Sequence, residues 1–208
     1  MWCGFTSSFI VRPLFFDEIG PAGFLNCTVN GVGYEYLLRN HVIPALQQCA
    51  RVSSIIFMQD GAPPHIANPV KRLLSMHFGN YRIISRHFPT NWPPRSPDLN
   101  PCDFWLWGYL KHVVFSDRIE ILVELKARSE QHIHIISQDT LQSVVEHAIS
   151  RFELVAENGG QHMEHFLSLS WCIGFQLAQL RVSQMSNDLE VIVLIIYFFS
   201  KTSYNHAH

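Results

Sequence analysis

Residues 57–65 read Phe57-Met58-Gln59-Asp60-Gly61-Ala62-Pro63-Pro64-His65, and the elements around them indicate the fold class. Residues 54–58 form a short apolar run, which predicts a buried β-strand. Asp60 stands just past the end of that strand, and residues 62–65 are typical of a turn because two prolines restrict the backbone. A helix is expected over residues 66–78, where apolar residues recur at helical spacing: Val70, Leu73, Leu74 and Phe78.

A second informative stretch, residues 92–111, reads WPPRSPDLNPCDFWLWGYLK. Prolines make residues 86–101 too stiff and too poor in backbone donors for a regular element. The stretch then predicts a helix start, with Asn100 as N-cap, Pro101 at the first helical position and Asp103 in the first turn. A second carboxylate is therefore expected at a fixed point, at the start of a helix.

The rest of the chain predicts an α/β layout. Further strands are expected over residues 1–5, 9–16 and 81–85, and further helices over 34–46, 119–136 and 137–158. Residues 17–30 are interpreted as a loop because glycine, proline and asparagine recur there. Pro44 should bend or interrupt its helix, since proline removes one backbone donor. Ser137 is expected to cap the last helix.

The composition is that of a globular protein, with 48% apolar and 15% charged residues. The formal net charge of −2 argues against strong, non-specific attraction to nucleic acid over the whole surface. Basic residues nevertheless gather after Asp60, which favours a local basic face: Lys71, Arg72, Arg82, Arg86 and Arg95. A solvated helix face followed by a loop explains the same pattern equally well.

The cysteines and histidines predict no metal or disulfide framework. The five cysteines are scattered without a CxxC spacing, which favours a reducing compartment, and the paired histidines (His132 with His134, His162 with His165) are typical of surfaces. No signal peptide is visible at the start. The apolar run over residues 191–199 is shorter than the ~20 residues that cross a bilayer, so a strand, a short helix or a tail is expected there and no membrane contact.

Asp60 and Asp103 are the candidate catalytic and metal-binding residues. Carboxylates held on separate rigid elements can converge on a pair of divalent ions about 3.5–4 Å apart, as in phosphodiester chemistry. Mg²⁺ prefers oxygen ligands and keeps several waters, so few side chains are needed. A purely structural role fits Asp103 as well, because an acidic residue in a first helical turn interacts favourably with the helix dipole.

The two stretches together resemble the DDE/DDD endonuclease domain of mariner-like transposases, over residues 1–165. In that family an aspartate ending a strand in a "QDGAPPH"-like word is the second metal ligand, and an acid shortly after "SPDLNP" is the third. The resemblance assigns these roles to Asp60 and Asp103. It also implies a ribonuclease H-like fold (a mixed sheet with flanking helices, followed by C-terminal helices), Mg²⁺ or Mn²⁺ as cofactor, DNA as partner, a possible homodimer and a nuclear location.

The chain departs from the family at its start. The family's first catalytic aspartate lies on the first strand of the fold, and Met1-Trp2-Cys3-Gly4 resembles the strand after it. The domain over residues 1–165 is therefore expected to lack its first strand. The sheet then lacks its central strand, unless another segment fills in. Residues 166–208 are expected to be a poorly specified extension. Asp17, with Glu18 beside it, is the one carboxylate near an early strand end, at the wrong strand.

This departure leaves three functions open. The first is a transposase-derived, DNA-binding chain whose two-metal site is catalytically impaired. The second is a host-recruited interaction module that uses the helices after residue 119. The third is an active nuclease whose remaining ligand comes from an unexpected residue or from a partner chain. Candidate nucleic-acid contacts are His65, Lys71, Arg72, Trp92 and Arg95. A turn or capping role suits His65 equally, Asp98 is expected in an Asx-type turn, and core packing is favoured for Trp105 and Trp107 over base stacking.

Overall fold

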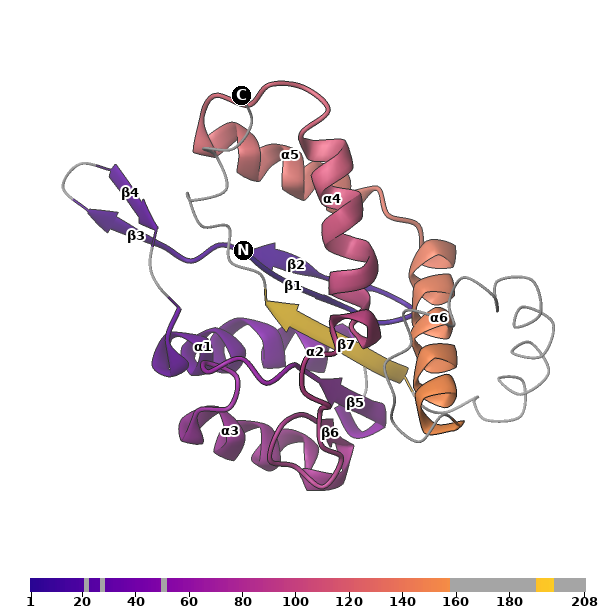
Figure 1. The fold of residues 1–208 in the computed structure, drawn as a ribbon. Coiled ribbons are helices and arrows are strands. Elements are labelled where there is room, and N and C mark those ends of the chain that lie inside the picture. The colour runs from indigo at the N-terminus through magenta and orange to yellow at the C-terminus, as the bar shows by residue number, and fades with distance from the viewer. Residues whose placement is uncertain (21–22, 27–28, 50–51, 158–189, 197–208) are drawn as a thin grey trace.

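The computed structural model describes residues 1–20, 23–26, 29–49, 52–157 and 190–196. Its main feature is a five-stranded sheet in the order β2-β1-β7-β5-β6. The strands are β1 (Trp2–Phe5), β2 (Ile10–Leu14), β5 (Ile55–Met58), β6 (Ile83–Ile84) and β7 (Glu190–Ile196). The predicted mixed α/β sheet with helices packed around it, an incomplete ribonuclease H-like fold, is confirmed (Figure 1).

The sheet changes direction at its centre. Strand β1 is antiparallel to both β2 and β7, whereas β5 is parallel to both β7 and β6. The central position, which the sequence left without a strand, is therefore occupied by Glu190–Ile196 from the C-terminal part of the chain. The boundary expected at residue 165 falls outside the described residues and stays a prediction.

Residues 17–30 contain a hairpin, so the prediction of a loop was wrong. Strands β3 (Asp17–Gly20) and β4 (Gly23–Asn26) pair antiparallel and form a separate two-stranded sheet. Glycine, proline and asparagine are typical of tight turns between strands as well as of loops, so composition did not separate the two cases. Asp17 thus lies outside the five-stranded sheet.

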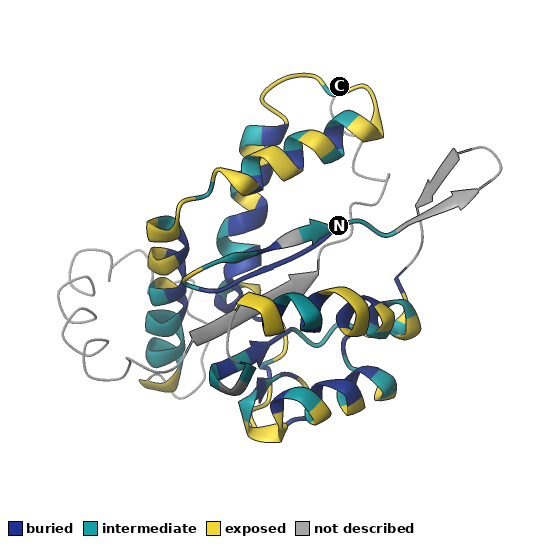
Figure 2. Cartoon of the chain, turned by 180° about the vertical axis from the view of Figure 1, so that it is seen from behind, coloured by how far each residue is buried: buried dark blue, intermediate teal, exposed yellow. Residues whose placement is uncertain are grey.

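One face of the sheet is covered by α1 (Gly31–Leu37), η1 (Leu38–Val42), α2 (Ile43–Cys49) and α3 (Asn68–Phe78) (Figures 1 and 2). The expected apolar stripes are confirmed, because Tyr34, Leu38 and Leu46 on the first helix and Leu74 on α3 are all fully buried. The interruption expected at Pro44 takes the form of the π-helical segment η1 directly before it. These helices pack with Trp2 and Phe57 into the first core.

The other face carries η4 (Pro97–Leu99), η5 (Cys102–Leu106), α4 (Trp107–Val114), α5 (Leu122–His134) and α6 (Gln138–Glu157). They form a second core with side chains from β1 and β5, among them Phe5 and Met58. Ser137 caps α6 as expected, since its hydroxyl accepts the Thr140 N–H at 3.3 Å. None of the described helices is both long enough and apolar enough to cross a membrane.

Strand β6 is shorter than the run expected over residues 81–85. Asn80–Arg82 forms a 3-10 turn, η3, and the Arg82 guanidinium donates to the backbone carbonyl of Val52 at 2.5 Å. A second short turn, η2 (Val52–Ser54), leads into β5. Arg82 therefore links η3 to η2 by a hydrogen bond. Its guanidinium is used inside the fold and does not contribute to the expected basic face.

Gly31 marks the closest approach of α1 to the segment before α3. A Cβ atom at residue 31 would lie 2.4 Å from the Ala67 Cβ. We expect Gly31→Ala to lower the free energy of unfolding by about 1–3 kcal/mol, since overpacked atoms force the backbone to shift. Urea unfolding measures this change. Gly33→Ala in the same helix is the control, because its Cβ would meet only Asn30 Oδ1 at 3.6 Å. Ala67→Gly should restore part of the loss, and a Gly31→Ala chain as stable as wild type would contradict the predicted clash.

Candidate metal-binding carboxylate site

Asp60 lies in a tight turn directly after β5. Its Oδ1 atom accepts the backbone N–H of Ala62 at 3.0 Å and also contacts the Nδ1 atom of His65. A carboxylate that accepts the N–H two residues ahead closes an Asx-type turn, which fixes the side chain. No hydrogen bond within the described part of the chain reaches Asp60 Oδ2. The aspartate is thus held through one oxygen, and its other oxygen has no hydrogen-bond partner among the described residues.

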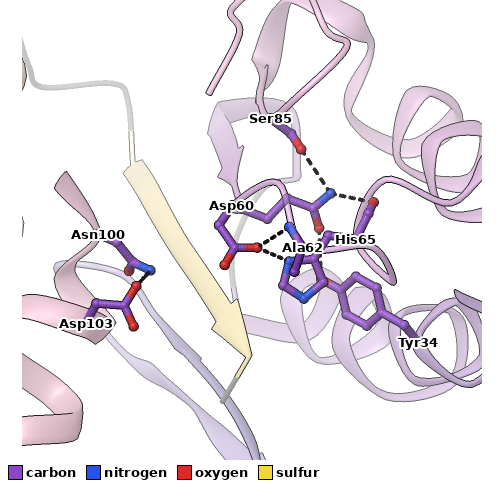
Figure 3. Close-up of polar contacts among 8 residues, drawn as sticks. Tyr34, Asp60, Ala62, His65, Ser85, Asn100 and Asp103 are labelled. Atoms are coloured by element: carbon purple, nitrogen blue, oxygen red, sulfur yellow. Dashed lines mark hydrogen bonds and ion pairs between the residues drawn. The ribbon is translucent and has the colours of Figure 1, made fainter. Parts of the chain in front are cut away.

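A buried polar network holds this turn in place (Figure 3). The Tyr34 hydroxyl donates to Gln59 Oε1 at 2.9 Å. The Gln59 amide nitrogen donates to the carbonyl of His65 at 3.0 Å and to the Ser85 hydroxyl at 3.2 Å. Gln59 is fully buried, and a buried amide needs such partners. Sequence reasoning missed Tyr34 and Gln59, although a glutamine directly after an apolar strand was a signal.

His65 supports Asp60 from the interior. Its side chain is 1% exposed, and its ring packs against Tyr34 with centroids 4.8 Å apart. The burial argues against the nucleic-acid contact predicted for His65. His65 has the turn role that the sequence offered as the alternative, because its backbone N–H donates to the carbonyl of Ala62. Its side chain also contacts Asp60.

Asp103 is fixed by the residue that starts its helix. The Asn100 side chain accepts the backbone N–H of Cys102 at 3.0 Å and donates to Asp103 Oδ2 at 2.5 Å. This confirms Asn100 as the cap and Asp103 as a first-turn residue, although the turn is π-helical. Asp98 lies in the preceding turn η4, where its carbonyl accepts from Arg151. Asp103 Oδ1 has no hydrogen-bond partner among the residues that the structure describes.

The two carboxylates interact electrostatically. Burial and the negative charge of Asp60 raise the pKa of Asp103 to about 6, against a lowering by its Asn100 hydrogen bond. For Asp60, burial raises the pKa, but the His65 hydrogen bond and charge and the Ala62 N–H outweigh it, so the pKa lies below its ordinary value. The repulsion is what a shared cation would relieve.

The donor set fits a divalent cation that keeps much of its water. The two carboxylates interact electrostatically, and each leaves one oxygen without a hydrogen-bond partner among the described residues. No cluster of three or more His, Cys, Asp or Glu side chains occurs within the described ranges. Mg²⁺ is bound in many proteins through only one or two carboxylates, which is the number present here.

The other predicted nucleic-acid residues fall into two groups. Arg72 and Arg95 are exposed and Lys71 is half-buried, so these three can contribute to a basic surface. Trp92 is buried and meets Phe152 edge-on at 6.4 Å, which argues against the predicted stacking on bases. Core packing is confirmed for Trp107, which is buried, and Trp105 stacks on Tyr109.

Replacing His65 tests its support of Asp60. We expect His65→Ala to raise the pKa of Asp60, since the largest stabilising contact of the carboxylate is lost. His65→Asn is the matched variant, because its amide nitrogen can occupy the place of Nδ1 and should keep the pKa low. Carboxyl ¹³C NMR titration measures both. An unchanged Asp60 pKa in His65→Ala would show that the contact does not stabilise the carboxylate.

Comparisons with known proteins find transposases. No family model matches the chain. The Tc3 transposase of Caenorhabditis elegans is 29% identical over 93 residues, which are 45% of this chain and 25% of that protein. The chain thus spans about a quarter of this curated relative.

Solved structures extend the likeness to the fold. The Mos1 transposase catalytic domain, determined with raltegravir and Mn, is 24% identical with a TM-score of 0.56, over 68% of this chain and 70% of that one. The Mos1 strand transfer complex gives 25% identity and a TM-score of 0.53, over 68% of this chain and 39% of that one. The two sequence motifs, the sheet and these relatives together show that the chain, over part of its length, is similar to the catalytic domain of mariner-like transposases.

Proposed function

We propose that this chain is a transposase-derived DNA-binding protein with a remnant two-metal site for phosphodiester cleavage and strand transfer. The observation that carries the proposal is the pairing of Asp60 with Asp103. They come from separate elements, each is fixed through one oxygen, and the charge of one raises the pKa of the other. Structural carboxylates have no need of such mutual repulsion, whereas perturbed pairs are common at functional sites.

Mg²⁺ or Mn²⁺ would be held by Asp60 Oδ2 and Asp103 Oδ1. Mos1, the structural relative, has been determined with Mn and with Mg. A bound metal supplies Lewis-acid chemistry for attack on a phosphodiester. The protein's own residues orient the site, since the His65 contact and the Asn100 cap keep both carboxylates in place.

Catalysis is proposed to be impaired. Strand β7 occupies the centre of the sheet, but residues 191–196 of this strand are all apolar. Glu190 pairs with Ile55 at the start of β5, whereas Asp60 follows the end of β5. No third carboxylate is thus supplied next to Asp60 and Asp103 by the described residues.

DNA binding is proposed to use the exposed basic residues beyond Asp60. Arg72 and Arg95 are exposed, and each phosphate contact by such a residue adds to the salt dependence of binding. A nuclear location and a homodimer are proposed as family properties.

Two assays on the purified chain test the proposal. A gel shift at 50 and 200 mM salt should show binding that weakens with salt and is reduced in Arg72→Ala and Arg95→Ala, with Arg118→Ala, an exposed arginine on the loop before α5, as control. Nicking of DNA with Mg²⁺ should be absent or very weak. No DNA binding at low salt would overturn the first part. Robust Mg²⁺-dependent nicking, abolished in Asp60→Ala, would overturn the impairment.

A second function, a protein-interaction module, is favoured by one observation. Ile121, Val123 and Ile135 at the two ends of α5 are each more than half exposed although they are large and apolar. Such side chains suit a protein partner. Salt-independent failure to bind DNA in the gel shift would favour this function over the first.

A further inference from the structure

The position of β7 in the sheet links the two candidate carboxylates. Strands β1 and β5 are not neighbours in the sheet, because β7 lies between them and pairs with both. Asp60 directly follows β5. The helix of Asp103 packs on β1, where Trp105 meets Phe5 with ring centroids 5.8 Å apart, and it shares the second core with Met58 of β5. Within the described sheet, β7 is therefore the strand that joins the Asp60 half to the Asp103 half.

The register of β7 places the strand between β1 and β5 but brings no carboxylate-bearing residue next to Asp60. It pairs in parallel with β5 from Ile55↔Glu190 to Met58↔Val193, so its one acidic residue pairs with the first residue of β5, whereas Asp60 follows the last. Against β1 it runs antiparallel, from Trp2↔Ile196 to Phe5↔Val193. The first half of β7, residues 190–193, pairs with β5, and the second half, residues 193–196, pairs with β1, so each half of the strand is held on one edge and Val193 on both.

We propose that Glu190–Ile196 is an intramolecular sheet-completing strand that sets the relative position of Asp60 and Asp103 without supplying a ligand. Helix α6 ends at residue 157 and β7 begins at residue 190, so residues 158–189 separate the strand from α6 in the sequence. Because the strand is covalently linked to the sheet that it completes, its local concentration is high, so insertion into its own chain is favoured over insertion into a second copy. The proposal rests on the proposed metal-binding function only for its second half.

The register can be tested directly through a native thiol. Cys3 is a free cysteine, and it pairs with Ile195 across β1 and β7. Directly opposed residues on antiparallel strands have Cα atoms about 4.5–5.5 Å apart, within the range of a disulfide. Oxidation of Ile195→Cys during refolding should therefore yield an intramolecular crosslink to Cys3, identified by peptide mapping of the monomer band. Refolding is used because burial raises the pKa of the Cys3 thiol to about 12 and slows its reaction in the folded chain.

Leu194→Cys is the matched control, one register position away and opposite Gly4. It should crosslink to Cys3 at least tenfold less, because successive residues of a strand point to opposite faces. Equal crosslinking by both variants would overturn the register. A crosslink found in dimers and not in monomers would overturn insertion in cis and show that a second copy supplies the strand.

The spacing role is tested by breaking the strand in the full chain. Leu194→Pro removes a backbone donor from the strand and cannot continue a central strand. We expect faster amide hydrogen exchange in both β1 and β5 and at least tenfold weaker Mn²⁺ binding, while the oxidised Ile195→Cys chain keeps wild-type affinity within about threefold. Unchanged exchange in β1 and β5 would overturn the joining role.

Metal binding separates the two proposals. If the wild-type chain binds no Mn²⁺, the proposed function fails, yet crosslinking and hydrogen exchange still decide whether β7 completes the sheet. A folded Leu194→Pro chain with wild-type Mn²⁺ affinity would overturn the spacing role alone. If Leu194→Pro does not fold, the loss of protection from amide hydrogen exchange in all strands of the sheet supports the joining role. The register is then tested by the crosslink between Cys3 and Ile195→Cys alone.

Discussion

Replacing Asp60 by asparagine is expected to weaken Mn²⁺ binding by roughly tenfold or more, because one of the two charged ligands becomes neutral. Asparagine keeps the size of the side chain and can still accept the Ala62 N–H that closes the turn. The loss therefore reports charge and not misfolding. Mn²⁺ titration followed by electron paramagnetic resonance measures the affinity, with Asp98→Asn, on the neighbouring turn η4, as the control. Equal Mn²⁺ affinity in Asp60→Asn and wild type would remove Asp60 from the site.

The same substitution is expected to change the pH dependence of stability. The pKa of Asp103 is about 6 in the folded chain and about 3.8 when the residue is unperturbed. Between these values the folded chain binds more protons than the unfolded chain, so this residue makes stability fall as the pH rises from about 4 to 6. In Asp60→Asn the repulsion is gone, the pKa of Asp103 falls, and the decline should flatten. Urea unfolding at pH 4.5 and 7 measures it, and an identical decline in both proteins would rule out the interaction.

Phe57→Ala should cause the largest loss of stability, about 3–5 kcal/mol, because a fully buried aromatic ring is removed and a cavity is left. The Phe57 ring packs on Phe78 with centroids 5.0 Å apart and thereby joins β5 to α3. Since domains of this kind are stable by about 5–15 kcal/mol, the loss threatens folding at physiological temperature. It also reaches the site, because Asp60 follows the same strand.

Thermal and urea unfolding of the purified variant measure this effect. Tyr81→Ala is the control, because the Tyr81 side chain is 87% exposed and its removal should change stability by less than about 0.5 kcal/mol. Phe57→Leu should lie between the two, since it retains much of the apolar volume. A loss in Phe57→Ala no larger than in Tyr81→Ala would mean that β5 and α3 do not pack as described.

The candidate site was predictable where local rules apply. Asp60 after an apolar strand and Asp103 behind an asparagine–proline helix start follow from periodicity and capping, which act over a few residues. The hydrogen bonds from Tyr34 to Gln59 and from Gln59 to Ser85 join residues about 25 positions apart, and no local pattern encodes them. The burial of His65 and Trp92 also depends on distant side chains, which is why their predicted contacts with nucleic acid do not fit the structure.

Local sequence patterns predict the α/β sheet of this chain, the positions of its two carboxylates at fixed ends of rigid elements, and its resemblance to mariner-like transposases. Apolar spacing, turn residues and helix caps are local, so they can be interpreted without a partner. Only the tertiary structure decided that β7 lies between β1 and β5. Strand pairing depends on an edge supplied by remote residues, and an apolar run such as residues 191–196 carries no local record of which edge that is.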